Sequence, residues 1–132
     1  MQQLKIKTNK NKEVIDITGI VNDLLMKNSY HNGHCYLFLT HTTCGITTAD
    51  LDPGTDQDYI NAFMELIPKI QYNHPHDPAH FGDHFLASIV GPGLYVPVQN
   101  ASMVLGSYQK VVLFEFSGPR ERTLLVNYIK EP

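Results

Sequence analysis

Three apolar runs rich in β-branched and aromatic residues place the strongest constraint on how this chain can fold. They span residues 35–41, 110–116 and 122–129. Such residues favour strands, and the apolar side chains on both faces of the first run predict a strand that lies inside a sheet. Only residues 117–121, which include a Gly-Pro turn signal, separate the last two runs. The chain is therefore expected to be built around a largely antiparallel sheet.

Weaker patterns fill in the remaining elements. Residues 4–7 alternate apolar and charged side chains, and together with residues 14–15 they predict a hairpin. One helix is expected to begin at Thr18 as its capping residue, and a second to begin at Thr55 and end before Pro68. Residues 94–98 read as an edge strand, because Pro97 cannot donate a ladder hydrogen bond.

The segment between the second helix and this edge strand is rich in histidine. Residues 71–83 contain two prolines and a glycine, which predict a loop, and residues 87–90 form only a short apolar segment. Residues 1–132 are thus predicted to form a single α+β domain with two main helices and a largely antiparallel sheet, curled or folded into a sandwich.

Composition narrows the class of protein. A chain of 132 residues with 42% hydrophobic residues can bury a core, and a net charge of -3 argues against nucleic acid as the main partner. No apolar stretch approaches 18 residues, so no membrane span is expected. The polar, lysine-rich start lacks the apolar part of a signal peptide, and two cysteines make no disulfide framework. These features predict a cytoplasmic protein.

Histidine is the unusual residue type, with seven in the chain and four at positions 74, 76, 80 and 84. Three neutral imidazoles and a water form a common open zinc site. His41 ends a predicted strand, while His74 and His84 flank the loop, so the loop can bring two rings against the strand. His76 and His80 compete for the same role. His41 can equally be a buried, hydrogen-bonded residue that ends its strand.

The residues at the end of the predicted strand 35–41 resemble a known family. The sequence His41-Thr42-Thr43-Cys44-Gly45-Ile46-Thr47 resembles the HTT-A-G-I-T signature of the YjbQ family, which is named for a secondary thiamine-phosphate synthase activity. Further segments are similar to the family in the same order, and they cover nearly the whole chain. They are residues 13–18, 52–58, 72–74, 84–91, 96–98, 105–109 and 118–120.

The resemblance implies a fold, an assembly and a reaction. Family members are single α+β domains that typically form homotrimers, and they carry a histidine-lined pocket regarded as a divalent metal site, with zinc as the first candidate. The matching positions here are His41, His74 and His84. The named reaction joins a pyrimidine diphosphate to a thiazole phosphate and releases pyrophosphate. Two departures stand out, because Asp50 replaces the family's usual glutamate and Leu86 replaces a lysine.

Residue chemistry suggests roles around such a pocket. Arg120 and Arg122 follow a tight turn and can bind phosphate oxygens bidentately, with a solvated strand end as the alternative for each and the favoured one for Arg122. The hydroxyl groups of three residues can donate to an anion, and an amide can line the pocket. These residues are Thr42, Thr43, Ser88 and Gln109.

Two carboxylates complete the prediction. Asp50 is a candidate general base. Glu115 interrupts an apolar strand, so it is expected to act in catalysis, to orient a ligand histidine, or to pair with an arginine. A metal-dependent hydrolase of a small phosphorylated or acyl substrate and a non-catalytic trimeric metabolite-binding protein remain as alternatives to the synthase. The expected partner is a small phosphorylated metabolite, with no nucleic acid and no membrane.

Overall fold

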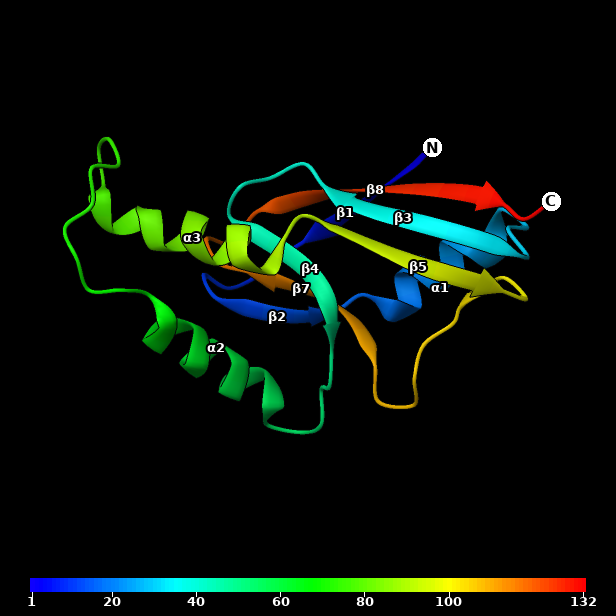
Figure 1. Cartoon of the computed structure of the whole chain (residues 1–132), viewed down its shortest axis with the longest axis horizontal. Helices are drawn as coiled ribbons and strands as arrows, with labels where there is room; N and C mark the ends of the chain where they lie inside the picture. The colour runs from blue at the N-terminus through cyan, green and yellow to red at the C-terminus, as the bar shows by residue number, and fades with distance from the viewer.

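Two antiparallel sheets form the framework of the structure, a computed structural model that describes all of residues 1–132 (Figure 1). The five-stranded sheet has the order β1-β8-β3-β5-β6, and the three-stranded sheet has the order β2-β7-β4. The strands are β1 (Gln2–Lys7), β2 (Glu13–Asp16), β3 (Gly33–Leu39), β4 (Cys44–Ala49), β5 (Gly93–Gln99), β6 (Ser102–Met103), β7 (Lys110–Glu115) and β8 (Glu121–Lys130).

The strongest strands of the sequence occupy the centres of the two sheets. In the larger sheet β8 lies between β1 and β3, so that Leu124 faces Leu4 on one side and Leu39 on the other. In the smaller sheet β7 lies between β2 and β4. The five residues Val111 to Glu115 are all buried, as expected for a strand covered on both faces.

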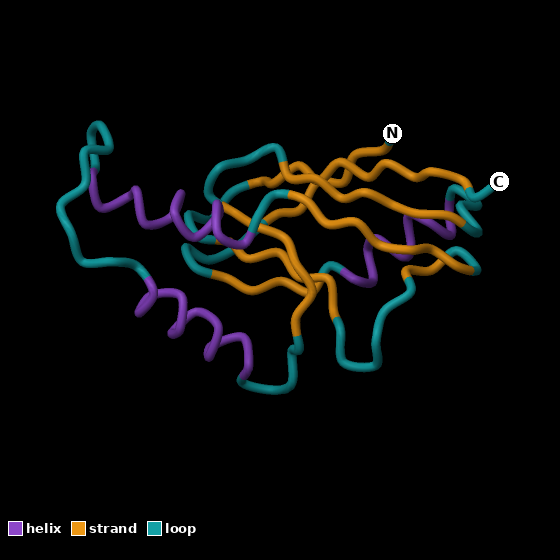
Figure 2. Tube along the Cα trace, in the orientation of Figure 1, coloured by secondary structure: helices purple, strands orange, loops and turns teal.

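Two hydrophobic clusters cover the two faces of β7. Leu113 belongs to the larger cluster, which fills the space between the sheets and includes Val21 and Leu25 of α1 (Thr18–Lys27). Phe114 belongs to the smaller cluster, which lies under α2 (Thr55–Leu66) and α3 (Phe81–Val90). Figure 2 shows these two helices together at one end of the molecule, with α1 at the other end.

The α+β class and the folded antiparallel sheets confirm the prediction, but the chain has a third helix, α3, where a loop and a short segment were expected. Pro78 does not prevent the helix, because it begins the short 3-10 turn Pro78–His80 that leads into α3, and proline is tolerated in a first turn. Gly82 is also accommodated, since it faces Ile67 at a distance where an added Cβ would lie 3.0 Å from Cδ1.

A smaller correction concerns the start of α1. Thr18 was expected to cap this helix, but Ile17 holds the capping position, and the Asp16 carboxylate accepts a hydrogen bond from the Thr18 backbone N–H at 2.9 Å. The Thr18 hydroxyl instead accepts a hydrogen bond from the Val111 N–H at 2.8 Å, which ties α1 to β7.

None of the helices has the length and apolar character needed to cross a membrane.

Candidate functional site

The largest pocket, about 640 Å³ in volume, opens where β3 ends, β8 begins and α3 starts. No hydrophobic residue lines it. The lining consists of Thr40, His41, Thr42, Thr43, His80, His84, Arg120, Glu121 and Arg122. A pocket of hydroxyl, imidazole and guanidinium groups suits an anionic ligand, because nearly all of these groups can donate hydrogen bonds.

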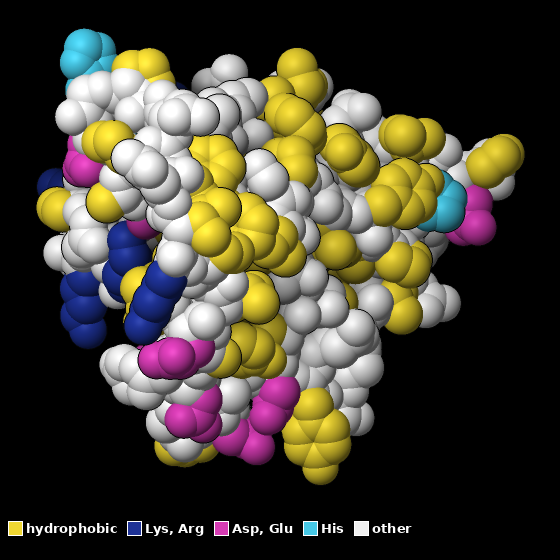
Figure 3. Space-filling view, turned by 60° about the vertical axis from the view of Figure 1, so that its left-hand side comes forward, with side chains coloured by type: hydrophobic (Ala, Val, Ile, Leu, Met, Phe, Trp, Pro, Cys, Tyr) yellow, Lys and Arg dark blue, Asp and Glu magenta, His cyan; other side chains and the backbone are white.

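The surface charges near this end of the molecule are separated by sign. Figure 3, which is turned to bring the α2 and α3 end forward, shows Lys and Arg side chains gathered at the left edge and acidic side chains mostly below them.

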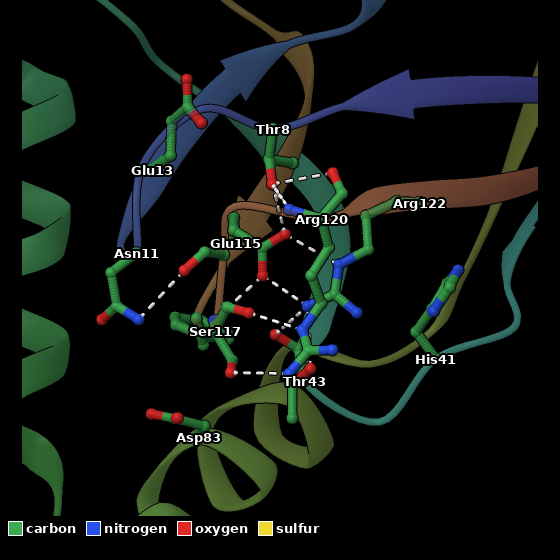
Figure 4. A network of polar contacts seen from close by, with 12 residues as sticks. Thr8, Asn11, Glu13, His41, Thr43, Asp83, Glu115, Ser117, Arg120 and Arg122 are labelled. Atoms are coloured by element: carbon green, nitrogen blue, oxygen red, sulfur yellow. Dashed lines mark hydrogen bonds and ion pairs between the residues drawn. The ribbon is translucent and has the colours of Figure 1, made fainter.

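A buried ion pair forms the floor of the pocket. Glu115 and Arg122 are 1% and 2% exposed, and the guanidinium contacts both carboxylate oxygens, with Nε to Oε2 at 2.7 Å (Figure 4). The Thr8 hydroxyl and the Ser117 N–H also donate to Glu115, each at 2.9 Å. Burial raises the pKa of Glu115, but these hydrogen bonds and the charge of Arg122 outweigh it, so the pKa lies below its ordinary value.

The same arginine fixes the loop between β3 and β4. Its Nη2 donates to the Thr43 carbonyl at 3.1 Å and to the Thr43 hydroxyl at 2.8 Å. Glu115 thus pairs with an arginine, one of the roles expected of it, and it lies beneath the pocket rather than in its lining. Its contribution to the site is to hold Arg122, which in turn holds the loop.

His41 lies at the end of β3 on the far side of Arg122 (Figure 4). Its Nε2 accepts a hydrogen bond from the Thr123 backbone N–H at 2.8 Å. Burial lowers the pKa of His41, and the positive charges of Arg122, Lys5 and Arg120 lower it further against the opposing effect of Glu115. The ring is therefore neutral at pH 7 and already bonded to β8.

Three other histidines gather beside the start of α3. The ring of His84 lies 4.9 Å from that of His74 and 4.9 Å from that of His80, measured between centroids. In each of these three rings Nδ1 is hydrogen-bonded to, or paired with, an oxygen atom. His74 bonds the Pro75 carbonyl at 2.9 Å, His84 bonds the Thr42 carbonyl at 3.1 Å, and His80 bonds the Asp83 carboxylate at 2.9 Å. Because a carbonyl oxygen only accepts, the Nδ1 of His74 and of His84 carries a proton and their Nε2 atoms are free.

The expected metal ligands do not form a metal site in this arrangement. His74 and His84 lie together, but the Nε2 lone pair of His41 is taken by Thr123. No group of three or more His, Cys, Asp or Glu side chains is arranged to hold a metal ion. The metal therefore stays a prediction, and none of the chemistry below depends on it.

The remaining predicted residues divide into two groups. Arg120 and Thr42 line the main pocket, and Ser88 lines a smaller adjoining pocket of about 250 Å³ together with His41 and His84. Thr43 lines the main pocket, although its hydroxyl is occupied by Arg122. These residues converge as the sequence suggested.

Asp50 and Gln109 do not reach the pocket. Asp50 follows the last residue of β4, whereas the pocket lies at the first, so a strand about 20 Å long separates them. Gln109 donates to the Thr48 hydroxyl at 3.3 Å and accepts from the Gly106 N–H at 2.7 Å, near the same distant end. The structure therefore does not bring either residue together with the histidines.

His80 lines the pocket, although the sequence favoured His41, His74 and His84 over it as metal ligands. Its carboxylate partner, Asp83, also accepts a hydrogen bond from the Lys12 ammonium at 2.8 Å, which fixes the carboxylate in place. The four-residue spacing between His80 and His84 is a signal for two rings on one side of a helix. The signal was obscured because Pro78 and Gly82 predicted a loop there.

Comparison with known proteins gives consistent matches. A family model described as UPF0047 protein YjbQ-like matches residues 2–131. The UPF0047 protein YugU of Bacillus subtilis is 34% identical over 127 residues, which cover 96% of this chain and 96% of that protein. The UPF0047 protein MJ1081 of Methanocaldococcus jannaschii is 33% identical over 126 residues, which cover 95% of this chain and 91% of that protein.

Solved structures agree with the sequence matches. The crystal structure of protein TT1486 from Thermus thermophilus superposes with a TM-score of 0.87 at 32% identity, covering 98% of this chain and 100% of that chain. The YbjQ-like protein SSO2532 from Sulfolobus solfataricus gives a TM-score of 0.89 at 27% identity, covering 98% and 96%. These names state a family and no substrate, so function has to be argued from the pocket.

Proposed function

Because this chain belongs to the YjbQ-like UPF0047 family, we propose that it binds a small phosphorylated metabolite and displaces pyrophosphate from it, as a secondary thiamine-phosphate synthase does. The observation that carries the proposal is the lining of the main pocket, which has two arginines, three histidines, three threonines and no hydrophobic residue. Such a set is suited to phosphate oxygens.

The proposed reaction requires that the departing pyrophosphate be stabilised. The C–O bond between the pyrimidine methylene carbon and the diphosphate breaks, the thiazole nitrogen forms a C–N bond to that carbon, and pyrophosphate departs with the electron pair. Donors fixed in advance around the departing oxygens lower the barrier, because charge develops there in the transition state. Arg120 and the Thr42 hydroxyl are the side chains assigned to this task, and both line the pocket.

Arg120 is well placed for binding an anion. Its Nε donates to the Ser117 carbonyl at 2.7 Å, which fixes the direction of the guanidinium while the side chain stays exposed. Arg122 differs, because its charge is balanced by Glu115 and its Nε and Nη2 donors are occupied. The free positive charge of the pocket therefore comes from Arg120.

The test is pyrophosphate release from the two thiamine precursors, measured with and without added Zn²⁺. Losing a charge-assisted hydrogen bond costs about 1.5–3 kcal/mol, so Arg120→Ala is expected to reduce the rate about tenfold or more. Lys27→Ala, which removes an exposed positive charge in the last turn of α1, is the matched control and should keep the wild-type rate. Equal rates for wild type and Arg120→Ala would refute the synthase proposal for this pocket.

A second candidate, hydrolysis of a small phosphorylated substrate, is supported by the contact between His80 and Asp83. A carboxylate that holds Nδ1 leaves Nε2 free to take a proton from water, whose oxygen attacks phosphorus as the P–O bond to the alcohol breaks, and Nε2 then returns the proton to the leaving oxygen. Turnover of p-nitrophenyl phosphate that disappears in His80→Ala would support it. Tight pyrophosphate binding without turnover of any substrate would instead favour a non-catalytic metabolite-binding protein.

The homotrimer and the divalent metal remain parts of the proposal that rest on the family resemblance. Sedimentation equilibrium tests the first, with a monomer of 14.9 kDa as the reference mass. Elemental analysis of protein purified without a histidine tag tests the second. A monomeric protein that never binds stoichiometric metal would remove both.

A further inference from the structure

We infer that His41 serves the pocket as a fixed hydrogen-bond donor, with Nε2 bonded to β8 and the Nδ1–H directed to an anionic ligand. This role differs from that of a metal ligand, which the sequence suggested. It rests on the proposed function, because it takes the ligand of the pocket to be an anion such as a phosphate or pyrophosphate.

The local geometry comes from the way β3 ends. β3 pairs with β8 as far as Leu39, which faces Leu124. The next residue of β8 is Thr123, which pairs with Lys5 of β1 but has no backbone partner on the β3 side. The imidazole of His41 fills this place, with Nε2 accepting the Thr123 N–H at 2.8 Å. His41 thus continues the sheet with a side chain after the backbone has turned away.

This contact determines which ring nitrogen carries the proton. A backbone N–H can only donate, so Nε2 must present its lone pair, and a neutral imidazole then has its proton on Nδ1. Binding a metal through Nδ1 would move the proton to Nε2, where it would point at the Thr123 N–H. The donor role and the metal-ligand role are therefore mutually exclusive while this hydrogen bond exists.

The Nδ1 atom is available to a ligand. No protein atom bonds it, and the only buried side-chain polar atom without a partner in the chain is the Nδ1 of His34, so that of His41 is open to solvent. The side chain lines the main pocket together with Thr42 and Arg120. Those two residues also donate hydrogen bonds, and an oxyanion is the ligand that accepts from all three.

The decisive experiment is long-range ¹H–¹⁵N NMR of the histidine rings in the wild-type protein at pH 7. A pyridine-like Nε2 and a protonated Nδ1 are expected for His41, with the signals assigned by their loss in His41→Gln. A protonated Nε2 would overturn the inference. Thr123→Ala keeps the backbone N–H and should leave the ring signals in the same form.

Titration with inorganic pyrophosphate separates the inference from the proposed function. Saturation is expected to shift the Nδ1 and Hδ1 signals of His41. If pyrophosphate binds and these signals do not move, the donor role is wrong while the anion pocket stands. If pyrophosphate does not bind at all, the proposed function fails and the donor role fails with it.

Two variants add a comparison of affinities. His41→Ala should weaken pyrophosphate binding about tenfold or more, as expected when a hydrogen bond to a charged group is lost. Glutamine carries an acceptor and a donor on one side chain, so His41→Gln should recover most of that loss. A metal ligand would behave differently, because glutamine would then be as weak as alanine.

Discussion

Replacing Glu115 with glutamine tests the structural account of the site most directly. Glutamine has nearly the same volume, so packing is largely kept, although its single oxygen can accept on only one side and its NH2 group faces the donors on the other. The charge also changes, because Arg122 stays protonated and only 2% exposed with no counterion. Breaking one partner of a buried ion pair leaves an uncompensated charge, which typically costs about 3–5 kcal/mol.

The expected change in melting temperature follows from the size of the chain. A domain of 132 residues has an unfolding entropy of about 0.28 kcal/mol/K, at roughly 2.1 cal/mol/K per residue. A loss of 3–5 kcal/mol therefore lowers the melting temperature by about 11–18 °C. The measurement is thermal unfolding followed by circular dichroism at pH 7, with urea unfolding as a second probe.

Two further variants show whether charge is the cause. Glu121→Gln removes an exposed carboxylate at the start of β8 and should change stability by no more than about 0.5 kcal/mol. The double variant Glu115→Leu/Arg122→Met removes both charges and should be more stable than Glu115→Gln. A melting temperature for Glu115→Gln within about 4 °C of wild type, or a double variant less stable than the single, would refute this account.

Three more outcomes follow from the same structure. Folding lowers the pKa of Glu115, so its stabilising effect is complete above its unfolded pKa near 4.5 and is lost as the pH falls through its folded pKa. The difference in unfolding free energy between wild type and Glu115→Gln should therefore narrow when unfolding is measured at successively lower pH. Burial raises the thiol pKa of Cys44 to about 12, so iodoacetamide at pH 8 should label it only after denaturation, as mass spectrometry can show; rapid native labelling would contradict its burial. Gly45→Ala would place Cβ 2.7 Å from the Val90 side chain and should cost about 1–3 kcal/mol in urea unfolding, whereas Gly19→Ala, with no atom within 4 Å, should be neutral or stabilising.

The strands were largely predictable because their apolar runs are long and rich in β-branched residues. The division into two sheets was not, since β7 and β8 are neighbours in sequence yet lie in different sheets. The burial of both faces of β7 depends on α3, and α3 was hidden by Pro78 and Gly82. Local breaker residues predicted a loop there, but their position at the start of the helix removed their effect.

The site was predictable where its residues follow strand ends. His41, Thr42 and Arg120 come directly after or between strong strands, and the pocket brings them together. Asp50 belongs to the same signature region, but the length of β4 carries it to the opposite end. The partner of His41 is a backbone N–H, which has no residue signature, so its hydrogen bond could not be seen in the sequence.

The position of β8 between β1 and β3 has a consequence for synthesis on the ribosome. β1 ends at Lys7, whereas the strand it pairs with begins only at Glu121. At about 5–20 residues per second, β1 waits roughly 6–23 s for its partner. Until β8 leaves the exit tunnel, both β1 and β3 have open edges that invite pairing with other chains. The emergence of β8, rather than of any earlier strand, is therefore the event that covers the inner edge of β1 and the facing edge of β3.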